Sequence, residues 1–155
     1  MSASNYQPAK LFTIEQANAT LPLVRAITAD LAALARDVMD RRHRLAKLTA
    51  GRDLKAGDPY SEELAQMEAD LETDVARLQG YIEELTALGV EPKGAIDGLV
   101  DFPSLMDGRI VYLCWKLGEP EVLHWHELEG GFAGRQSLVA ESAAGYGDEL
   151  GESFG

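Results

Sequence analysis

Two long segments of this chain repeat apolar residues at heptad spacing, and this pattern constrains the fold more than any other feature of the sequence. Each segment also has one charged residue in an inward position, Arg41 in the first and Asp74 in the second. The apolar residues are Val24, Ile27, Leu31, Leu34, Val38, Leu45 and Leu48, then Leu64, Met67, Leu71, Leu78, Tyr81, Leu85 and Leu88. The spacing predicts two amphipathic helices that pack along a common seam.

The stretch between the two segments, Gly51 to Tyr60, predicts a turn, because the run from Gly57 to Pro59 cannot continue a helix. Ser61 is the expected cap of the second helix, and Gly89 is placed to end it. Each helix then runs for about 28 residues, or about 42 Å. Equal lengths on either side of a short loop predict an antiparallel helical hairpin over residues 13–89.

The start of the first helix has two signals. Thr13 and Gln16 have the spacing of a capping box, which predicts a short helix from this point. Pro22 is a poor residue deep inside a helix, so either Thr20 caps a second segment or Pro22 marks a kink. In both cases we expect the long helix to begin near residue 21.

The two charged residues in the seam predict a pairing. Folding about the loop brings Arg41 near Asp70 and Asp74. We therefore expect these polar positions to pair and fix the register of the hairpin, and not to form a functional site.

After Gly89 the pattern changes from helical to extended. Three segments rich in β-branched and aromatic residues, 96–102, 109–117 and 121–128, predict a three-stranded antiparallel meander. A glycine-rich loop follows at residues 130–136. The expected fold is therefore α+β, with the meander packed near the open end of the hairpin.

The domain boundaries follow from these elements. We expect a polar N-terminal tail at residues 1–10 and a single domain at 11–139, whose β-meander and glycine-rich loop occupy 90–139. Residues 140–155 are small, acidic and glycine-rich, which predicts a disordered tail.

The charge balance limits the partners. The chain has 155 residues, of which 26 are acidic and 14 basic, for a net charge of -12. Such a surface repels nucleic acid and anionic lipid, and its one basic cluster (Arg41, Arg42, Arg44 and Lys47) lies where cations also suit the end of a helix. We expect neither a nucleic-acid partner nor a membrane partner.

The cysteine count and the N-terminus favour the cytoplasm. Cys114 is the one cysteine, so no internal disulfide forms, and the first residues contain no apolar stretch typical of a signal peptide.

The C-terminal motifs resemble a known family. The motifs are Gly98-Leu-Val-Asp-Phe-Pro-Ser-Leu-Met-Asp-Gly-Arg109, Leu113-Cys-Trp-Lys-Leu-Gly-Glu-Pro120, Trp125-His-Glu127 and Gly131-Phe-Ala-Gly-Arg-Gln136. Together with Phe12-Thr-Ile-Glu-Gln-Ala-Asn18 and Leu21-Pro22, they are similar to the bacterial family called domain of unknown function 2203. The resemblance covers about residues 11 to 138. It implies a small bacterial protein and no particular activity, substrate or catalytic residue.

Two histidines indicate a candidate metal site. His124 and His126 are two apart on a predicted strand, so both imidazoles project from one face. A third ligand must come from a neighbouring element, and the candidates are Cys114, Asp101, Asp107 and Glu129. The alternative is that both histidines are ordinary sheet residues, one bonded to a backbone carbonyl and the other exposed.

Cys114 depends on the strand register. A three-residue turn at Gly118 to Pro120 places it opposite His124, with Tyr112 opposite His126, whereas a two-residue turn reverses this parity. A site with the thiolate favours zinc or another borderline-soft ion, and a site with carboxylates alone leaves iron, manganese and nickel in competition.

A second candidate site would bind anions. Arg135 follows a glycine-rich turn, and Lys116 and Arg109 could add positive charge. The alternative, which we favour, is that Arg135 pairs with an acidic residue and pins the loop to the sheet.

Two function hypotheses follow. The first is a non-catalytic interaction or assembly module, a homodimer or a binder of a protein partner, because a two-helix seam leaves its flanks open. The second is a transition-metal protein, or a metal-dependent enzyme, using His124 and His126. Nucleophilic catalysis is not expected, because Cys114 lies in an apolar strand, where a thiol is usually inert. Trp115 and Trp125 are expected to pack in the core and not to stack on a ligand.

Overall fold

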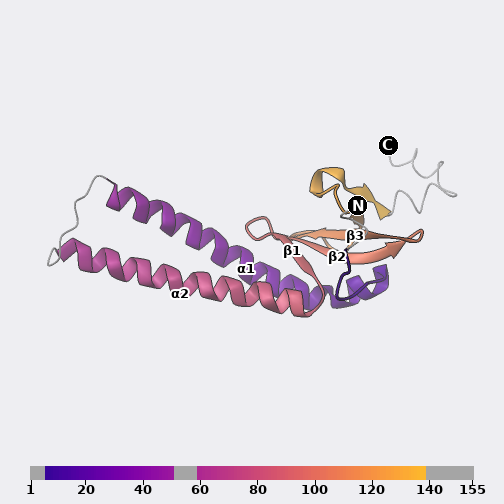
Figure 1. Ribbon diagram of the computed structural model, residues 1–155, viewed down its shortest axis with the longest axis horizontal. Coiled ribbons are helices and arrows are strands. Elements are labelled where there is room, and N and C mark those ends of the chain that lie inside the picture. Colours follow the sequence, from indigo (N-terminus) through magenta and orange to yellow (C-terminus); the bar gives the residue numbers. More distant parts are fainter. Residues whose placement is uncertain (1–5, 51–58, 139–155) are drawn as a thin grey trace.

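A computed structural model of the chain describes residues 6–50 and 59–138. Two helices, α1 (Ile14–Thr49) and α2 (Pro59–Ala87), form a long antiparallel hairpin (Figure 1). Five strands follow within the described residues: β1 (Glu91–Gly94), β2 (Leu99–Met106), β3 (Arg109–Lys116), β4 (His124–His126) and β5 (Gln136–Ser137), with a short 3-10 helix, η2 (Phe132–Gly134), before the last. The α+β class and the hairpin are confirmed. None of the described helices combines the length and the apolar character that crossing a membrane requires.

Helix α1 starts at the predicted capping box. The backbone N–H of Gln16 donates to Thr13 Oγ1 over 3.0 Å, and the Thr13 N–H donates to Gln16 Oε1 over the same distance. The predicted break near residue 21 is wrong, because α1 runs through Pro22 for 36 residues. Tertiary contacts hold the helix on both sides of the proline. Before it, Leu21 is buried and Asn18 Oδ1 accepts a bond from the backbone N–H of Val122 over 2.7 Å, and after it Val24 is buried in the core.

Helix α2 begins at Pro59, so Ser61 lies inside the first turn and is not the cap. A proline suits this position, since its missing N–H would have no partner in the helix. Gly89 has a φ of 90° and follows the last turn, as predicted. Most of the predicted loop, residues 51–58, lies outside the described residues.

The polar positions of the seam pair in part as predicted. Arg41 forms ion pairs with Asp74 on the opposite helix and with Asp37 on its own. Asp70 takes no part, because its carboxylate accepts a bond from Gln66 one turn away. The pairing of Arg41 with Asp74 therefore joins the two helices midway along the hairpin.

The sheet is antiparallel, in the order β1-β2-β3-β4-β5, so the prediction of three strands is wrong. The sequence Glu91-Pro-Lys-Gly94 looks like a loop, yet it pairs with β2 at the edge of the sheet, where proline is tolerated. Strand β5 has only two residues and begins at the last residue of the predicted glycine-rich loop. Strand β2 continues to Met106, beyond the predicted end at residue 102, and the two residues after it form the turn to β3.

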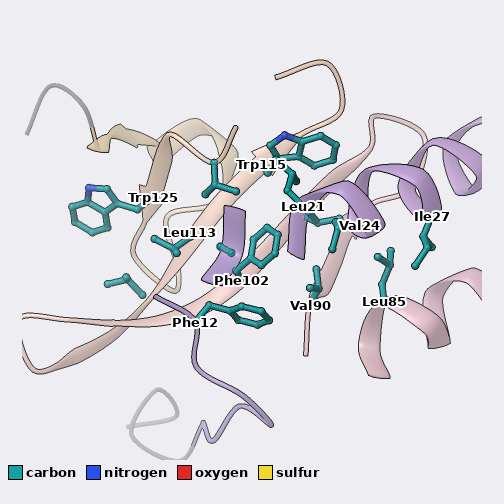
Figure 2. Packing of buried hydrophobic residues seen from close by; sticks show 14 of the residues in the cluster. Phe12, Leu21, Val24, Ile27, Leu85, Val90, Phe102, Leu113, Trp115 and Trp125 are labelled. Atoms are coloured by element: carbon teal, nitrogen blue, oxygen red, sulfur yellow. The ribbon is translucent and has the colours of Figure 1, made fainter. Parts of the chain in front are cut away.

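One face of the sheet packs against the open end of the hairpin. Figure 2 shows Phe102, Leu113 and Trp115 of the sheet beside residues of both helices. The buried cluster includes Phe12, Leu21, Val24, Ile27, Leu85, Val90, Phe102, Leu113, Trp115 and Trp125. The predicted core position of both tryptophans is confirmed.

The opposite face of the sheet carries the candidate metal ligands together with apolar residues such as Leu105 and Ile110. Strand alternation places Asp101, Cys114 and the two histidines there, because their neighbours Phe102, Leu113 and Trp125 point into the core. From the segment before α1, the Tyr6 hydroxyl bonds to Glu91 of β1. The predicted acidic tail at 140–155 lies outside the described residues.

Candidate metal centre

The strand register brings three potential metal ligands to one place on the face of the sheet that points away from the core. Asp101 of β2 is directly opposite Cys114 of β3. On the other side of β3, Cys114 is opposite His124 and Tyr112 is opposite His126, which is the register predicted for a three-residue turn. His126 is therefore diagonal to Cys114, within reach of long side chains.

The three side chains form a buried cluster of unlike donors. One ligand atom from each of Asp101, Cys114 and His126 lies within 4.8 Å of the other two. The exposed fractions are 2% for Asp101, 0% for Cys114 and 2% for His126. A carboxylate, a thiol and an imidazole thus converge in a part of the sheet that excludes water.

The hydrogen bonds of His126 decide which nitrogen faces the cluster. Its Nδ1 lies 2.6 Å from the backbone carbonyl oxygen of Glu127, which can only accept, so Nδ1 carries a proton. Its Nε2 lies 3.1 Å from each carboxylate oxygen of Asp101. In a neutral imidazole this nitrogen has a lone pair, so it and the carboxylate are two acceptors facing each other. A cation, either a proton or a metal ion, must lie between them.

The buried position also sets the charge states of the other two groups. Burial raises the pKa of Asp101, and the nearby His126 and a hydrogen bond with Cys114 oppose this rise. Burial raises the pKa of the Cys114 thiol to about 12, and the negative charge of Asp101 adds to the rise. The free thiol is therefore protonated at neutral pH and is a poor nucleophile, as expected from its place in an apolar strand.

A second layer of polar groups borders the cluster on the side of β1. The Lys93 ammonium lies 3.7 Å from Asp101 Oδ2 and 3.3 Å from Glu91 Oε1. The Tyr112 hydroxyl donates to Glu91 Oε1 over 2.8 Å, and the Lys93 ammonium stands 4.1 Å from the Tyr112 ring centroid. Lys93 is 37% exposed, so it lies between the buried cluster and solvent.

The structure places His124 outside the cluster. The Arg135 guanidinium, which can only donate, lies 2.6 Å from His124 Nδ1. The same guanidinium also donates to the Glu119 carboxylate over 2.7 and 2.8 Å. The lone pair of His124 Nδ1 is thus engaged by an arginine, and the two histidines of the motif have different partners.

The remaining predicted ligands lie further out. Asp107 is exposed in the turn between β2 and β3, with a φ of 53°, and Glu129 is exposed in the turn after β4. Neither belongs to the cluster of three. Glu127, next to His126, pairs with Arg109 at 2.5 Å.

The predicted anion-binding residues are only partly together. The guanidinium carbon of Arg135 lies 4.6 Å from the Phe132 ring centroid, and the Lys116 ammonium lies 5.3 Å from it. Arg109 is at the other end of β3, where it pairs with Glu127. Arg135 pairs with Glu119 and ties η2 and β5 to the turn before β4, which is the interpretation favoured from the sequence.

A comparison with protein families identifies the chain. The model of the family described as "Uncharacterized conserved protein (DUF2203)" matches residues 10–138. The chain belongs to this family. Comparisons with curated proteins and with solved structures gave no match.

Sequence reasoning missed several residues of the site in this family member. Glu91 and Lys93 belong to the unpredicted strand β1, and Tyr6 belongs to a segment predicted to be a tail. The sequence feature that could have drawn attention to Lys93 is its position as a single cation between Pro92 and Gly94, shortly before a segment rich in strand-forming residues.

Proposed function

We propose that this protein binds one divalent transition metal, zinc above the others, through Asp101, Cys114 and His126. The observation that carries the proposal is the convergence of three buried donors whose ligand atoms lie within 4.8 Å of one another. Nitrogen, sulfur and oxygen donors together suit a borderline-soft ion such as zinc.

The spacing of the donors supports a tetrahedral ion. Two ligands at about 2.1 Å from zinc and at a tetrahedral angle lie roughly 3.4 Å apart. The Nε2 of His126 lies 3.1 Å from each oxygen of Asp101, close to this value. A bound ion would also supply the cation that the two facing acceptors require, and its two positive charges would balance a carboxylate and a thiolate.

The ligand count has a chemical consequence. Three protein ligands leave one coordination position for water or a small ligand, the arrangement of catalytic zinc sites and not of closed structural ones. Lys93 lies beside Asp101 at the solvent side, where it could contact such a ligand. The site proposed here therefore has the elements of a metal-dependent enzyme.

Metal titration of the untagged protein tests the proposal. Zinc should bind at about one equivalent per chain, and cobalt should give the thiolate-to-metal absorption expected of a cysteine ligand. Cys114→Ser and His126→Gln should each abolish this absorption. His124→Gln is the matched control, because His124 lies on the same strand face but outside the cluster, and it should bind cobalt like the wild type.

Two results would overturn the proposal. One is a wild-type protein that takes up neither zinc nor cobalt at micromolar concentration. The other is a cobalt spectrum that survives the loss of Cys114 and His126.

A second candidate function is non-catalytic assembly, and one observation favours it. The hairpin extends far beyond the sheet, so most of its length has no other part of the described chain against it (Figure 1). We infer that this part of the hairpin is an interaction surface and that the chain forms a homodimer. Sedimentation at micromolar concentration should give about twice the monomer mass, and a monomer at all concentrations would exclude this function.

A further inference from the structure

A groove runs between the two helices in the half of the hairpin that lies away from the sheet. We call it the distal groove, and it is lined by Arg42, Leu45, Glu68, Leu71, Glu72 and Val75. A second hollow lies nearer the loop, lined by Leu48, Tyr60, Glu63, Leu64 and Met67. Both hollows combine apolar seam residues with charged residues at their rims.

The rims of the distal groove carry opposite charges. The α1 rim has Arg42, whereas the α2 rim has Glu68 and Glu72. All three residues are exposed, and none forms an ion pair with another residue in the ranges 6–50 and 59–138. By contrast, Arg41 on the adjacent position is already paired within the chain. The rim charges are therefore available to a partner.

Large apolar side chains are exposed in the same half of the hairpin. The exposed fractions are 40% for Met39, 37% for Leu48 and 57% for Tyr60. Isolated exposed apolar residues are common, but here they accompany a groove with an apolar floor.

We propose that the distal groove binds the distal groove of a second copy of this chain, in a two-fold four-helix arrangement. A two-fold axis parallel to the hairpin places the α1 rim of each copy against the α2 rim of the other. Arg42 of each chain then faces Glu68 and Glu72 of its partner, and both apolar floors are covered. The groove is self-complementary in charge, which is the requirement for an isologous interface.

The distribution of charge along the helices fixes the relative direction of the two hairpins. The basic residues Arg42, Arg44 and Lys47 lie near the loop end of α1. The loop half of α2 carries Glu62, Glu63, Glu68, Asp70 and Glu72, whereas its last turns carry Glu83 and Glu84. Hairpins that point the same way bring the basic end of α1 beside the more acidic half of the partner's α2. We therefore assign the parallel arrangement, with both sheets at one end.

This inference rests on the assembly role proposed above and is independent of the metal centre. It is tested by charge reversal and exchange in the full chain, with sedimentation equilibrium as the readout. Arg42→Glu should weaken the dimer by about tenfold or more, because two like-charge contacts replace two attractive ones. Glu68→Lys combined with Glu72→Lys should have the same effect.

An equimolar mixture of the two variants provides the decisive measurement. In a mixed dimer both rim contacts are again attractive, so the mixture should form a heterodimer where neither variant alone forms a dimer. Arg36→Glu is the matched control, because it makes the same charge change at another exposed position of α1 and should leave the dimer intact.

The outcomes separate this inference from the assembly role. A wild-type dimer that Arg42→Glu leaves unchanged, or variants that fail to restore each other when mixed, would place the interface elsewhere and overturn the groove assignment alone. A wild type that remains monomeric would overturn both. The circular dichroism spectrum of each variant shows whether its hairpin is folded.

Discussion

His126 Nε2 lies 3.1 Å from both carboxylate oxygens of Asp101, and both side chains are about 97% buried. The two residues are 25 positions apart in sequence and come from strands that are not neighbours, since β3 lies between them. Only the fold brings them together. Because His126 Nδ1 donates to a carbonyl, the Nε2 of a neutral imidazole and the Asp101 carboxylate are both acceptors. A proton or a metal ion must therefore lie between them, and a metal ion at this position is what we propose.

The first prediction concerns the charge of Asp101. Asp101→Asn keeps the shape of the side chain and removes its negative charge, so the zinc affinity should fall by roughly a hundredfold or more. Competition with a chelating dye measures it. Asp107→Asn provides the comparison, since this exposed turn residue lies outside the cluster and its loss should leave the affinity as it is. Equal affinities for the two variants would remove Asp101 from the ligand set.

The second prediction concerns metal removal. An ion present at a hundred times its dissociation constant stabilises the folded state by about 2.7 kcal/mol, so a chelator should lower the melting temperature by roughly 5–10 °C. Differential scanning calorimetry with and without the chelator measures the change. The Cys114→Ser variant should show no such change, and an equal change in that variant would mean that the chelator acts at another site.

The sequence predicted the strand register at this site but not which of the two histidines joins the cluster. The alternation of Tyr112, Cys114 and the two histidines predicts their common face and, with the correct turn length, their register. It does not distinguish His124 from His126, because both have the same strand parity. The distinction comes from remote partners, Asp101 for one histidine and Arg135 for the other.

The errors in the fold have a similar cause. Pro22 was expected to interrupt the first helix, and the segment around Pro92 was not among the predicted strands, yet the first lies in a helix and the second in a strand. Local propensity disfavours each, and tertiary contacts override it: Leu21 is buried against the core, and strand β1 pairs with β2 at the edge of the sheet. The heptad pattern predicted the hairpin correctly, because it is repeated at many positions along both helices.

The third prediction concerns the core between the sheet and the hairpin. Leu113→Ala removes a side chain that is completely buried in this core, so the free energy of unfolding should fall by about 2–5 kcal/mol. Urea denaturation measures this loss. Leu105→Ala on the neighbouring strand is the control, since Leu105 is 60% exposed and its truncation should change stability by less than about 0.5 kcal/mol. Similar losses for both would contradict the assignment of the two faces.

The fourth prediction concerns acid. Hydrogen bonds from Arg41 and Arg77 hold the pKa of Asp74 below its ordinary value of 3.8. A lowered folded-state pKa adds stability that is present above the unfolded value and disappears as the pH falls through the folded value. The melting temperature of Asp74→Asn should therefore be lower than that of the wild type at pH 6, and the two should converge as the pH falls through the lowered pKa of Asp74.

Melting curves measured at several pH values test this convergence. Asp70→Asn serves as the comparison, because Asp70 accepts a bond from Gln66 on its own helix and pairs with no cation among residues 6–50 and 59–138. A difference between wild type and Asp74→Asn that stays constant down to pH 2 would show that the ion pair does not link stability to this carboxyl group.

The last prediction concerns the close approach of the turn before β2 to the chain after β3. Gly98 has a φ of 70°, and a Cβ added there would lie 2.5 Å from the Cβ of Leu117. Its carbonyl also accepts a bond from the Leu117 N–H over 2.9 Å, so neither segment can move away freely. Gly98→Ala should therefore lower the free energy of unfolding by about 2–4 kcal/mol, from backbone strain and overpacking together. Gly108→Ala isolates the first term, since Gly108 has a φ of 81° and open space around it. It should cost only about 1–2 kcal/mol.

Adding Leu117→Ala to Gly98→Ala should not relieve the strain, because the contact is with the Cβ atom that alanine keeps. Leu117→Gly should relieve it, and a double-mutant cycle between these two positions measures the coupling. Equal losses for Gly98→Ala and Gly108→Ala, with no coupling to position 117, would show that the two segments do not approach this closely.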